Sequence, residues 1–504
     1  MEITLISPFG NLDNVGIRSI SSYLKSNKFD VNLVFMPSEG ATDISKHMDF
    51  ADYYSSKVLD QVAETCKKSK LIGITVMANY VPRVTKLTND LRKRGVKALI
   101  IWGGMHPTLC PEDCVNVADA ACVGEGEETF LELAKALRDN KGYENVPGLA
   151  FLKDNKFMKN SVGELPYDLD IYPDPDYRDM SKHYVLRNNS IVKFTKELYN
   201  EMMWVDHGYK KFMLFTTRGC PHRCTFCCNS SLVKIFEGKG RFIRKRSVER
   251  VIREMENIKK EFPFIQLFGL GDEVFFVRSL DELKEFSEKY KARINMPLQC
   301  EFSPMTVTED KFKLMVDCGL VGVQMGVQSG SDKTNFDLYE RYQTRETVRK
   351  AAEIIAKHDD KLKFYCYHFI IGNPLEGYQD KVDTIKFYFE LPGEFLALLI
   401  PLIFYPGAKL TKEAMEKKLI DEDDFHYTQG WNVRQYRDLS YLDYMFKILV
   451  VLRNRKLLKR GGFYTRAVVN FLTNKAVVNV LDRKLFLRPM YYGFLAYNNY
   501  VHPF

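Results

Sequence analysis

Residues 212–230 read FMLFTTRGCPHRCTFCCNS, in which a short apolar run typical of a β-strand leads directly into a cysteine-rich loop. Within the loop, Cys220, Cys224 and Cys227 have the spacing C-x3-C-x2-C. Three thiolates on one loop can bind three irons of a cubane cluster and leave the fourth iron open. An open iron can chelate a small molecule, which a purely electron-transferring cluster cannot do. The motif therefore predicts a [4Fe–4S] cluster with one open iron.

A structural zinc site is the alternative for these cysteines. Zinc would need a fourth ligand, and His222 or Cys228 could supply it within the loop. The chain around and after the loop favours the cluster, because strand and helix signals alternate through six βα units. Six units predict an open, partial barrel, smaller than the eight-unit closed form. The predicted strands are Phe212–Thr217, Phe264–Gly271, Ile294–Cys300, Gly319–Val327, Lys363–Gly372 and Phe395–Tyr405.

The three-cysteine loop at the start of a six-unit barrel resembles the radical S-adenosylmethionine (SAM) superfamily. The aromatic Phe226 before the third cysteine also matches, and the resemblance covers about residues 210–406. It implies that SAM chelates the open iron through its amino and carboxylate groups. It further implies that the reduced cluster cleaves SAM to a 5′-deoxyadenosyl radical.

Further segments at strand ends resemble the SAM-binding stations of that superfamily, in the expected order. GDE (271–273) is similar to a motif whose acid binds the SAM amino group, and GVQSGS (326–331) is similar to a ribose-contacting segment. FIIGNPLE (369–376) and YPGAKL (405–410) are similar to two later stations. Taken singly, each is explained as well by a turn at a strand end. The residues that the resemblance places at SAM are Asp272, Glu273, Gln328, Ser329 and Gly372.

The N-terminal region alternates strand and helix signals in the same way. Near-continuous apolar strands with helices between them predict a doubly wound parallel sheet, which binds ligands at the carboxyl ends of its strands. The predicted strands are Ile3–Pro8, Val31–Pro37, Leu71–Ala78, Ala98–Gly104 and Ala120–Gly126. The predicted helices are Val15–Ser26, about Ser55–Lys68, Val81–Arg94 and Glu127–Asn140.

GGMHPTLCPEDC (103–114) and CVGEGEETFLELAKAL (122–137) resemble the cobalamin-binding domain that precedes many radical SAM cores. A generic doubly wound sheet with glycine-rich turns is the alternative. The Asp-x-His-x-x-Gly motif of many cobalamin domains does not occur in the chain. The resemblance then implies cobalamin with its own base displaced and no protein histidine on cobalt. The candidate cobalamin residues are Gly103, Gly104, His106, Gly124, Glu125 and Gly126.

These signals divide the chain into four parts. We predict a cobalamin-binding domain at 1–140, a partial barrel at 211–406 and a helical, basic C-terminal region at 407–504. Between the first two, PYDLDIYPDPDY (166–177) is too rich in Pro and Asp for a long helix, so 141–210 is predicted to be a linker.

The composition is that of a soluble globular protein, with 45% hydrophobic and 27% charged residues. Eleven cysteines in a chain with no export-like N-terminus indicate a reducing cytoplasm, where free thiolates can bind metal. Residues 441–504 hold eleven Lys and Arg against two Asp and Glu. Between Tyr441 and Lys459 an apolar helical face is predicted, and we favour a face that packs on the barrel over one that lies on a membrane.

The combined prediction is a cobalamin-dependent radical SAM enzyme, most simply a methyltransferase acting on an unactivated carbon. A cyclase or rearrangement on the same scaffold, a methylthiotransferase and a non-catalytic cobalamin or cluster sensor are the alternatives. Its expected partners are a small-molecule or lipid-like substrate and an electron donor such as ferredoxin or flavodoxin, without nucleic acid. We assign no role to Cys228, Cys300 or Cys366, although the last two could face the SAM pocket.

Overall fold

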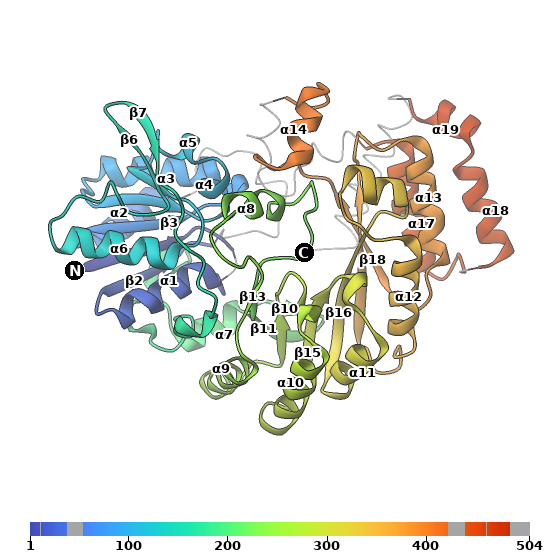
Figure 1. The fold of residues 1–504 in the computed structure, drawn as a ribbon, viewed down its shortest axis with the longest axis horizontal. Helices are drawn as coiled ribbons and strands as arrows, with labels where there is room; N and C mark the ends of the chain where they lie inside the picture. Colours follow the sequence, from blue (N-terminus) through green and yellow to red (C-terminus); the bar gives the residue numbers. More distant parts are fainter. Residues whose placement is uncertain (11, 38–53, 422–438, 460, 484–504) are drawn as a thin grey trace. The chain divides into compact units, whose positions relative to one another are not determined.

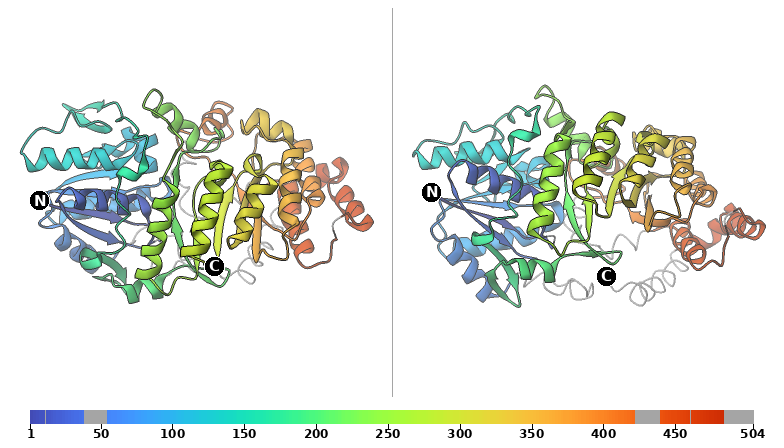
Figure 2. Two further views of the ribbon diagram at one scale, coloured as in Figure 1. Left: turned by 60° about the horizontal axis from the view of Figure 1, so that its bottom comes forward. Right: turned by 90° about the horizontal axis from the view of Figure 1, so that it is seen from below.

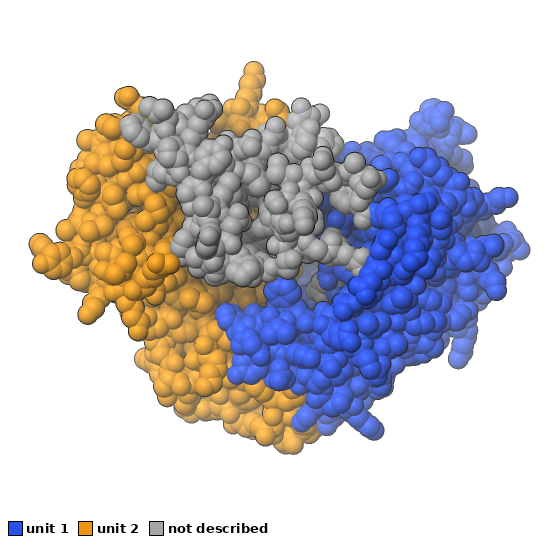
Figure 3. Space-filling model, turned by 180° about the vertical axis from the view of Figure 1, so that it is seen from behind, with its two compact units in different colours: residues 1–219, 231–267, 422–429 blue, residues 220–230, 268–421, 430–504 orange. Residues whose placement is uncertain are grey.

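The computed structural model describes residues 1–10, 12–37, 54–421, 439–459 and 461–483. These residues form two compact units, coloured separately in Figure 3. The first unit comprises Met1–Gly219 and Ser231–Leu267, and the second comprises Cys220–Ser230, Phe268–Asp421 and the described C-terminal helices.

The first unit is built on a nine-stranded sheet in the order β7-β6-β5-β4-β3-β1-β2-β8-β9 (Figure 1). Its centre consists of parallel strands that confirm the five sequence predictions and the predicted doubly wound class. The order β2-β1-β3-β4-β5 reverses between β1 and β3, which is where sheets of this kind bind ligands. The strands are β1 (Glu2–Ser7), β2 (Asp30–Phe35), β3 (Leu71–Thr75), β4 (Leu99–Gly103) and β5 (Ala120–Cys122).

Helices connect these strands at the predicted places. They are α1 (Val15–Ser26), α2 (Ser56–Cys66), α3 (Val81–Lys93) and α6 (Gly126–Arg138), with the short α4 (Met105–Leu109) and α5 (Pro111–Cys114) before β5. Helix α1 packs against α6, and α2 packs against α3, as expected when a sheet is covered on both faces. One apolar cluster packs α2 and α3 against the sheet and includes Trp102 of β4, which is buried.

Residues 141–210 do not form the simple linker that the sequence predicts. Instead they add β6 (Leu149–Lys153), β7 (Lys156–Lys159), β8 (His183–Arg187) and β9 (Ser190–Lys193) to the first sheet, and α7 (Lys196–Met202) follows these strands. Each pair is an antiparallel hairpin with a two-residue turn. The turn residues Asp154, Asn155, Asn188 and Asn189 all have positive φ, which the tight hairpin turn requires.

The second sheet has the order β10-β11-β14-β15-β16-β17-β18 and confirms the predicted partial barrel. From β14 onward, neighbouring strands are parallel and follow one another in the chain. The strands are β10 (Val205–Asp206), β11 (Tyr209–Leu214), β14 (Leu267–Leu270), β15 (Leu298–Phe302), β16 (Leu320–Gln328), β17 (Phe364–Ile371) and β18 (Leu396–Pro401). The connecting helices are α9 (Val248–Glu261), α10 (Leu280–Arg293), α11 (Glu309–Asp317), α12 (Arg345–Ala356) and α13 (Tyr378–Glu390), of which α10 to α13 cover the outside of the curled sheet (Figure 2).

The described C-terminal helices are α14 (Lys409–Glu416), α17 (Tyr441–Asn454), α18 (Phe463–Leu472) and α19 (Lys475–Leu481). The predicted apolar face is largely buried where it lies in α17, whereas Leu457, which the prediction also included, follows the helix and is 68% exposed. The buried members of the face are Leu442, Met445, Phe446, Leu449 and Val450. The aromatic residues after position 483 lie outside the described residues. Among those described, no helix is long and apolar enough to span a bilayer.

Candidate functional site

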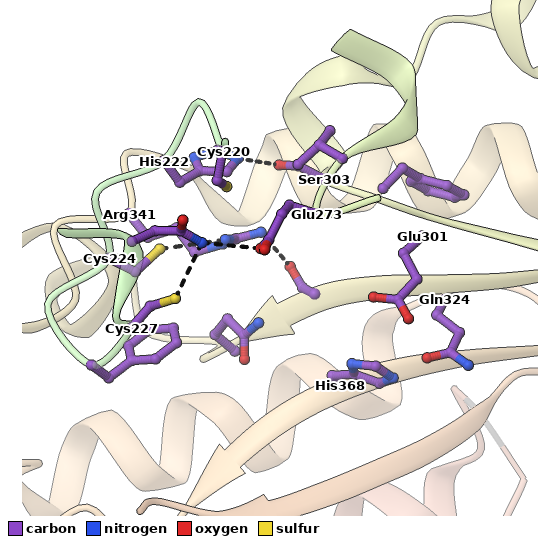
Figure 4. Close-up of a pocket in the computed structure, with 16 residues that line it drawn as sticks. Cys220, His222, Cys224, Cys227, Glu273, Glu301, Ser303, Gln324, Arg341 and His368 are labelled. Carbon is purple, nitrogen blue, oxygen red and sulfur yellow. Dashed lines mark hydrogen bonds between the residues drawn. The ribbon is translucent and has the colours of Figure 1, made fainter. Parts of the chain in front are cut away.

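The three cysteines of the motif line one cavity of about 150 Å³ in the second unit (Figure 4). Their loop lies between β12 (Thr217–Arg218) and α8 (Asn229–Ile235). A backbone turn closes it, because the Cys227 N–H donates to the Cys224 carbonyl at 3.0 Å. Cys224 is 4% exposed, whereas Cys220 and Cys227 are half-buried. The sequence prediction that these three residues act together is therefore matched by their placement.

Side chains around the loop donate hydrogen bonds to the cysteine sulfurs. Arg341 Nη1 lies 3.5 Å from Cys224 Sγ, and Asn229 Nδ2 lies 3.6 Å from Cys227 Sγ. Burial raises the pKa of Cys220 to about 12, while a hydrogen bond from the Cys228 thiol lowers the pKa of Cys227 to about 7. A buried thiolate needs a cation beside it, and coordination to iron deprotonates a thiol outright. The donor set is thus suited to hold a metal cluster.

The two candidate fourth ligands for zinc have other hydrogen-bond partners at this loop. His222 Nε2 is hydrogen-bonded to Ser303 Oγ at 2.7 Å, and Cys228 does not line the cavity. Within the described ranges, no three His, Cys, Asp or Glu side chains converge as ligands of a single ion. A cubane gives each cysteine an iron of its own, so its ligands need not converge on one point.

The five predicted SAM residues separate into two groups. Glu273 and Gln328 line the cavity with the cysteines. Asn229 Nδ2 holds Glu273 Oε2 at 3.0 Å, and burial raises the pKa of this carboxyl. Gln328 has a φ of +66°, an unusual conformation for a residue other than glycine, at the carboxyl end of β16.

The other three predicted SAM residues do not line the cavity. Asp272 is fully buried. Ser329 Oγ is hydrogen-bonded to Thr384 Oγ1 at 2.9 Å. The N–H of Gly372 donates to Asp443 Oδ1 of α17 at 3.0 Å. Glu273 is thus the acid of the GDE segment that lines the cavity with the cysteines, and a SAM contact of Asp272, Ser329 or Gly372 stays a prediction.

Polar residues of three neighbouring strands complete the wall of the cavity, and the sequence analysis did not find them. They are Glu301 of β15, Gln324 of β16 and His368 of β17, shown together in Figure 4. Glu301 is paired with Gln324 in the strand register, and Gly326, two residues after Gln324, is paired with His368. Burial lowers the pKa of His368 to about 4, so the imidazole is neutral near pH 7.

The edge strand β18 adds apolar side chains to the same face of the sheet. Leu398 is paired with His368, and Leu396 with Cys366, and paired residues of parallel strands point to the same side. Both leucines are solvent-accessible, at 42% and 46%. Cys366 Sγ lies 3.4 Å from His368 Nε2, whereas Cys300 is buried and does not line the cavity. This face of the barrel thus has a polar part and an apolar part.

In the first unit, the glycine-rich loops after β4 and β5 are joined by one side chain. Thr108 Oγ1 donates to the Gly104 carbonyl at 2.7 Å and accepts from the Gly124 N–H at 3.0 Å. Both glycines have positive φ, at +99° and +91°. His106 is buried in α4, with Nε2 3.9 Å from Asp113 Oδ2. These loops lie at the carboxyl edge of the sheet, where a doubly wound fold binds its ligand.

Three of the predicted cobalamin glycines also lie close to atoms of the protein itself. A Cβ at Gly104 would lie 3.0 Å from the Val76 carbonyl oxygen. A Cβ at Gly124 would lie 2.8 Å from Phe236, and one at Gly126 would lie 2.7 Å from Ile20. Positive φ and close protein atoms thus favour glycine at Gly104 and Gly124, whereas at Gly126 the end of the Ile20 side chain could move aside. At Gly103 a Cβ would meet Cys122 only at 3.7 Å, which leaves that backbone open to close approach.

Glu125, also predicted to contact cobalamin, has its carboxylate engaged in a cluster of ion pairs. Arg218 Nη1 lies 2.7 Å from Glu125 Oε2, and Arg244 binds the other oxygen. Arg218 also binds Glu127. Burial alone would raise the pKa of Glu125, but the two arginines outweigh it and lower the pKa. The carboxylate thus anchors the loop after β5 to β12, the short strand that leads into the cysteine loop.

The comparisons with known proteins agree with both halves of this description. Residues 1–134 match the B12 binding domain model, and residues 214–388 match the Radical SAM superfamily model. An uncharacterized methyltransferase of Pyrococcus horikoshii is 24% identical over 420 residues, covering 81% of this chain and 82% of that protein.

Two solved structures share the fold. The radical SAM methyltransferase TsrM from Kitasatospora setae, with tryptophan substrate and a SAM analogue bound, has a TM-score of 0.63 and 16% identity, covering 82% of this chain and 76% of that chain. OxsB, a cobalamin-dependent SAM radical enzyme with aqua-cobalamin bound, has a TM-score of 0.65 and 14% identity, covering 99% and 80%.

The fold and the site therefore define a radical SAM enzyme. More particularly, the chain belongs to the radical SAM enzymes that carry a cobalamin-binding domain. Its cofactors are a [4Fe–4S] cluster, SAM and cobalamin, and the family to which it belongs includes methyltransferases. The two family matches favour a cluster over the zinc alternative and a B12-binding domain over a generic sheet.

Proposed function

We propose that the protein transfers a methyl group to an unactivated carbon of an organic substrate. The observation that carries the proposal is one cavity in which the three cluster cysteines, Glu273 and a mixed polar wall come together. The likeness of the chain to a relative named as a methyltransferase supports the same reaction.

The cavity residues have separate tasks in this reaction. When bound, the cluster and SAM supply a 5′-deoxyadenosyl radical, and cobalamin supplies the methyl group. Glu273, oriented by Asn229, offers its carboxylate to the ammonium group of SAM. The Gln328 amide is placed to hydrogen-bond a ribose hydroxyl. Arg341 and Asn229 donate to the thiolates and hold the cysteine loop in one geometry.

The wall opposite the cysteine loop supports a substrate with both polar and apolar parts. Glu301, Gln324 and the neutral His368 can hydrogen-bond a polar group, and Leu396 and Leu398 can contact hydrocarbon. A small or lipid-like substrate bound to this wall would have a C–H bond placed near the cluster. Reduction of the cluster would come from a low-potential donor such as ferredoxin or flavodoxin.

The test is a product analysis of the anaerobically purified, fully loaded protein with reductant, SAM and a metabolite and lipid extract. We expect 5′-deoxyadenosine and S-adenosylhomocysteine to form together, because each methylation consumes one SAM for the radical and one for the methyl group. Cys220→Ala should abolish 5′-deoxyadenosine, whereas Cys228→Ala should not. Formation of 5′-deoxyadenosine without S-adenosylhomocysteine would replace the proposal with cyclisation or rearrangement. Absence of both products would leave the sensor alternative.

A further inference from the structure

Helix α18 presents large apolar side chains to solvent. Phe463 is 79% exposed, Tyr464 is 82% exposed and Phe471 is 65% exposed. Tyr464, Ala467 and Phe471 follow Phe463 by one, four and eight residues. At about 3.6 residues per turn, this spacing places all four residues on one side of the helix. Single exposed aromatic residues are common on protein surfaces, but several on one side of a helix form an apolar patch. Such a patch is typical of a surface that contacts a partner or a membrane.

This exposed side is additional to the side that holds α18 in the fold. Thr465 and Val469, on the opposite side of the helix, are 3% and 4% exposed. In the second unit, α18 and α19 lie outside α13 and α17, as the red helices of Figures 1 and 2 show. Leu457, which follows α17, and Val480 of α19 are also exposed, at 68% and 52%. We call Phe463, Tyr464 and Phe471 the α18 surface.

The charges beside the α18 surface are nearly all positive. In the described part of residues 455–483, the only acidic residue is Asp482. Six cationic side chains are exposed there: Arg455, Lys456, Lys459, Arg466, Lys475 and Arg483. Aromatic and aliphatic side chains surrounded by Lys and Arg are characteristic of segments that insert into the interface of a bilayer with anionic lipids.

We propose that the α18 surface docks on an anionic membrane, with its aromatic side chains at the headgroup boundary and its cations on lipid phosphates. A nucleic acid could bind the cations through its phosphates and stack its bases on the rings. It would not bury the exposed aliphatic side chains of Leu457 and Val480, which flank α18 in the chain. An anionic membrane offers hydrocarbon to the apolar side chains and phosphates to the neighbouring Lys and Arg residues. The proposal replaces the buried face of α17 with a different surface, and it does not depend on the reaction assigned to the barrel.

The test is sedimentation of the full-length protein with vesicles of phosphatidylcholine alone and with vesicles that also contain phosphatidylserine. We expect binding to the anionic vesicles that weakens in high salt, because each cation contributes about five-fold to the partition. Phe463→Ser with Tyr464→Ser should weaken binding at least ten-fold, since each ring buries apolar area. Trp204→Ser is the matched control, because Trp204 is 66% exposed in the first unit.

Other outcomes would overturn the proposal. The double variant should keep its iron content and its circular dichroism spectrum, so that lost binding reports on the surface itself. Equal binding by the double variant, or absence of binding to anionic vesicles, would exclude the α18 surface as a membrane contact. A dimer that becomes a monomer in the double variant would identify a second copy as the occupant. Tighter binding to an oligonucleotide than to vesicles, lost in the same variant, would identify nucleic acid.

Discussion

Arg341 is the cationic side chain that binds a cluster cysteine, and its replacement gives the sharpest test of the site. Its Nη1 donates to Cys224 Sγ at 3.5 Å, Nη2 donates to the Gly326 carbonyl at 3.2 Å and Nε donates to Gln343 Oε1 at 2.9 Å. The guanidinium is thus fixed beside one thiolate. A fixed cation stabilises the extra electron of a reduced cluster. We therefore predict that Arg341→Met makes the cluster harder to reduce.

The size of the effect follows from the contact with Cys224. A hydrogen bond to a charged group is worth about 1.5–3 kcal/mol. The oxidised cluster also accepts this bond, so the potential reports only the part of its energy that is gained on reduction. For one electron, 59 mV corresponds to about 1.4 kcal/mol, and the reduction potential should therefore fall by at most about 130 mV. Arg341 is only 7% exposed, and water screens the interaction little.

The assay is a redox titration of the cluster followed by electron paramagnetic resonance. Arg341→Lys keeps the positive charge and should shift the potential less than Arg341→Met. Arg349→Gln is the control, because Arg349 is paired with Glu346 on the surface of α12 and should leave the potential unchanged. A fully loaded Arg341→Met protein with the parent potential would refute the reasoning.

Three further predictions concern the metal, the first unit and pH. Cys220→Ala should remove the roughly four irons per chain that Cys228→Ala retains, as measured by iron assay. Glu125→Gln should lower the free energy of unfolding in urea by about 3 kcal/mol, because Arg244 would stay buried without its partner; an unchanged midpoint would contradict this. Burial lowers the pKa of Lys447 from 10.5 to about 7, so the unfolded chain binds one more proton between these values and stability should rise with pH there. Lys447→Met should remove that rise in the thermal melting temperature, whereas the exposed Lys417→Met should not.

The fold was predictable where local signals and tertiary structure agree. The five parallel strands of the first sheet and the helices between them follow from long apolar runs and helical periodicity. The hairpins β6–β7 and β8–β9 were missed because their strands are short and partly charged, as in KFMK of β7. Their turns do carry a readable signal: Asp154–Asn155 and Asn188–Asn189 are residue types that tolerate positive φ at a two-residue turn.

The glycine-rich loops show a second limit. A glycine-rich loop indicates that the backbone is closely approached at that point. It does not indicate whether the neighbour is a ligand or another part of the protein. At Gly124 and Gly126 the near atoms belong to Phe236 and Ile20, which are distant in the chain. Likewise, nothing in the local sequence indicates that Glu125 is bound by Arg218 and Arg244. Long-range contacts of this kind come only from the folded structure.

The barrel wall shows why the functional face was hardest to predict. Strands of a parallel sheet are covered on both faces, so their sequences are nearly continuous in apolar residues and hide which side faces the cavity. In β16, Gln324, Gly326 and Gln328 alternate with buried apolar residues. This short alternation indicates that they share one face of the strand, but not that this face lines the cavity. Register then brings Gln324 beside Glu301 and Gly326 beside His368. Polar residues that are isolated in sequence thus become one wall, and the chemistry of this side of the cavity is set by strand pairing rather than by any contiguous motif.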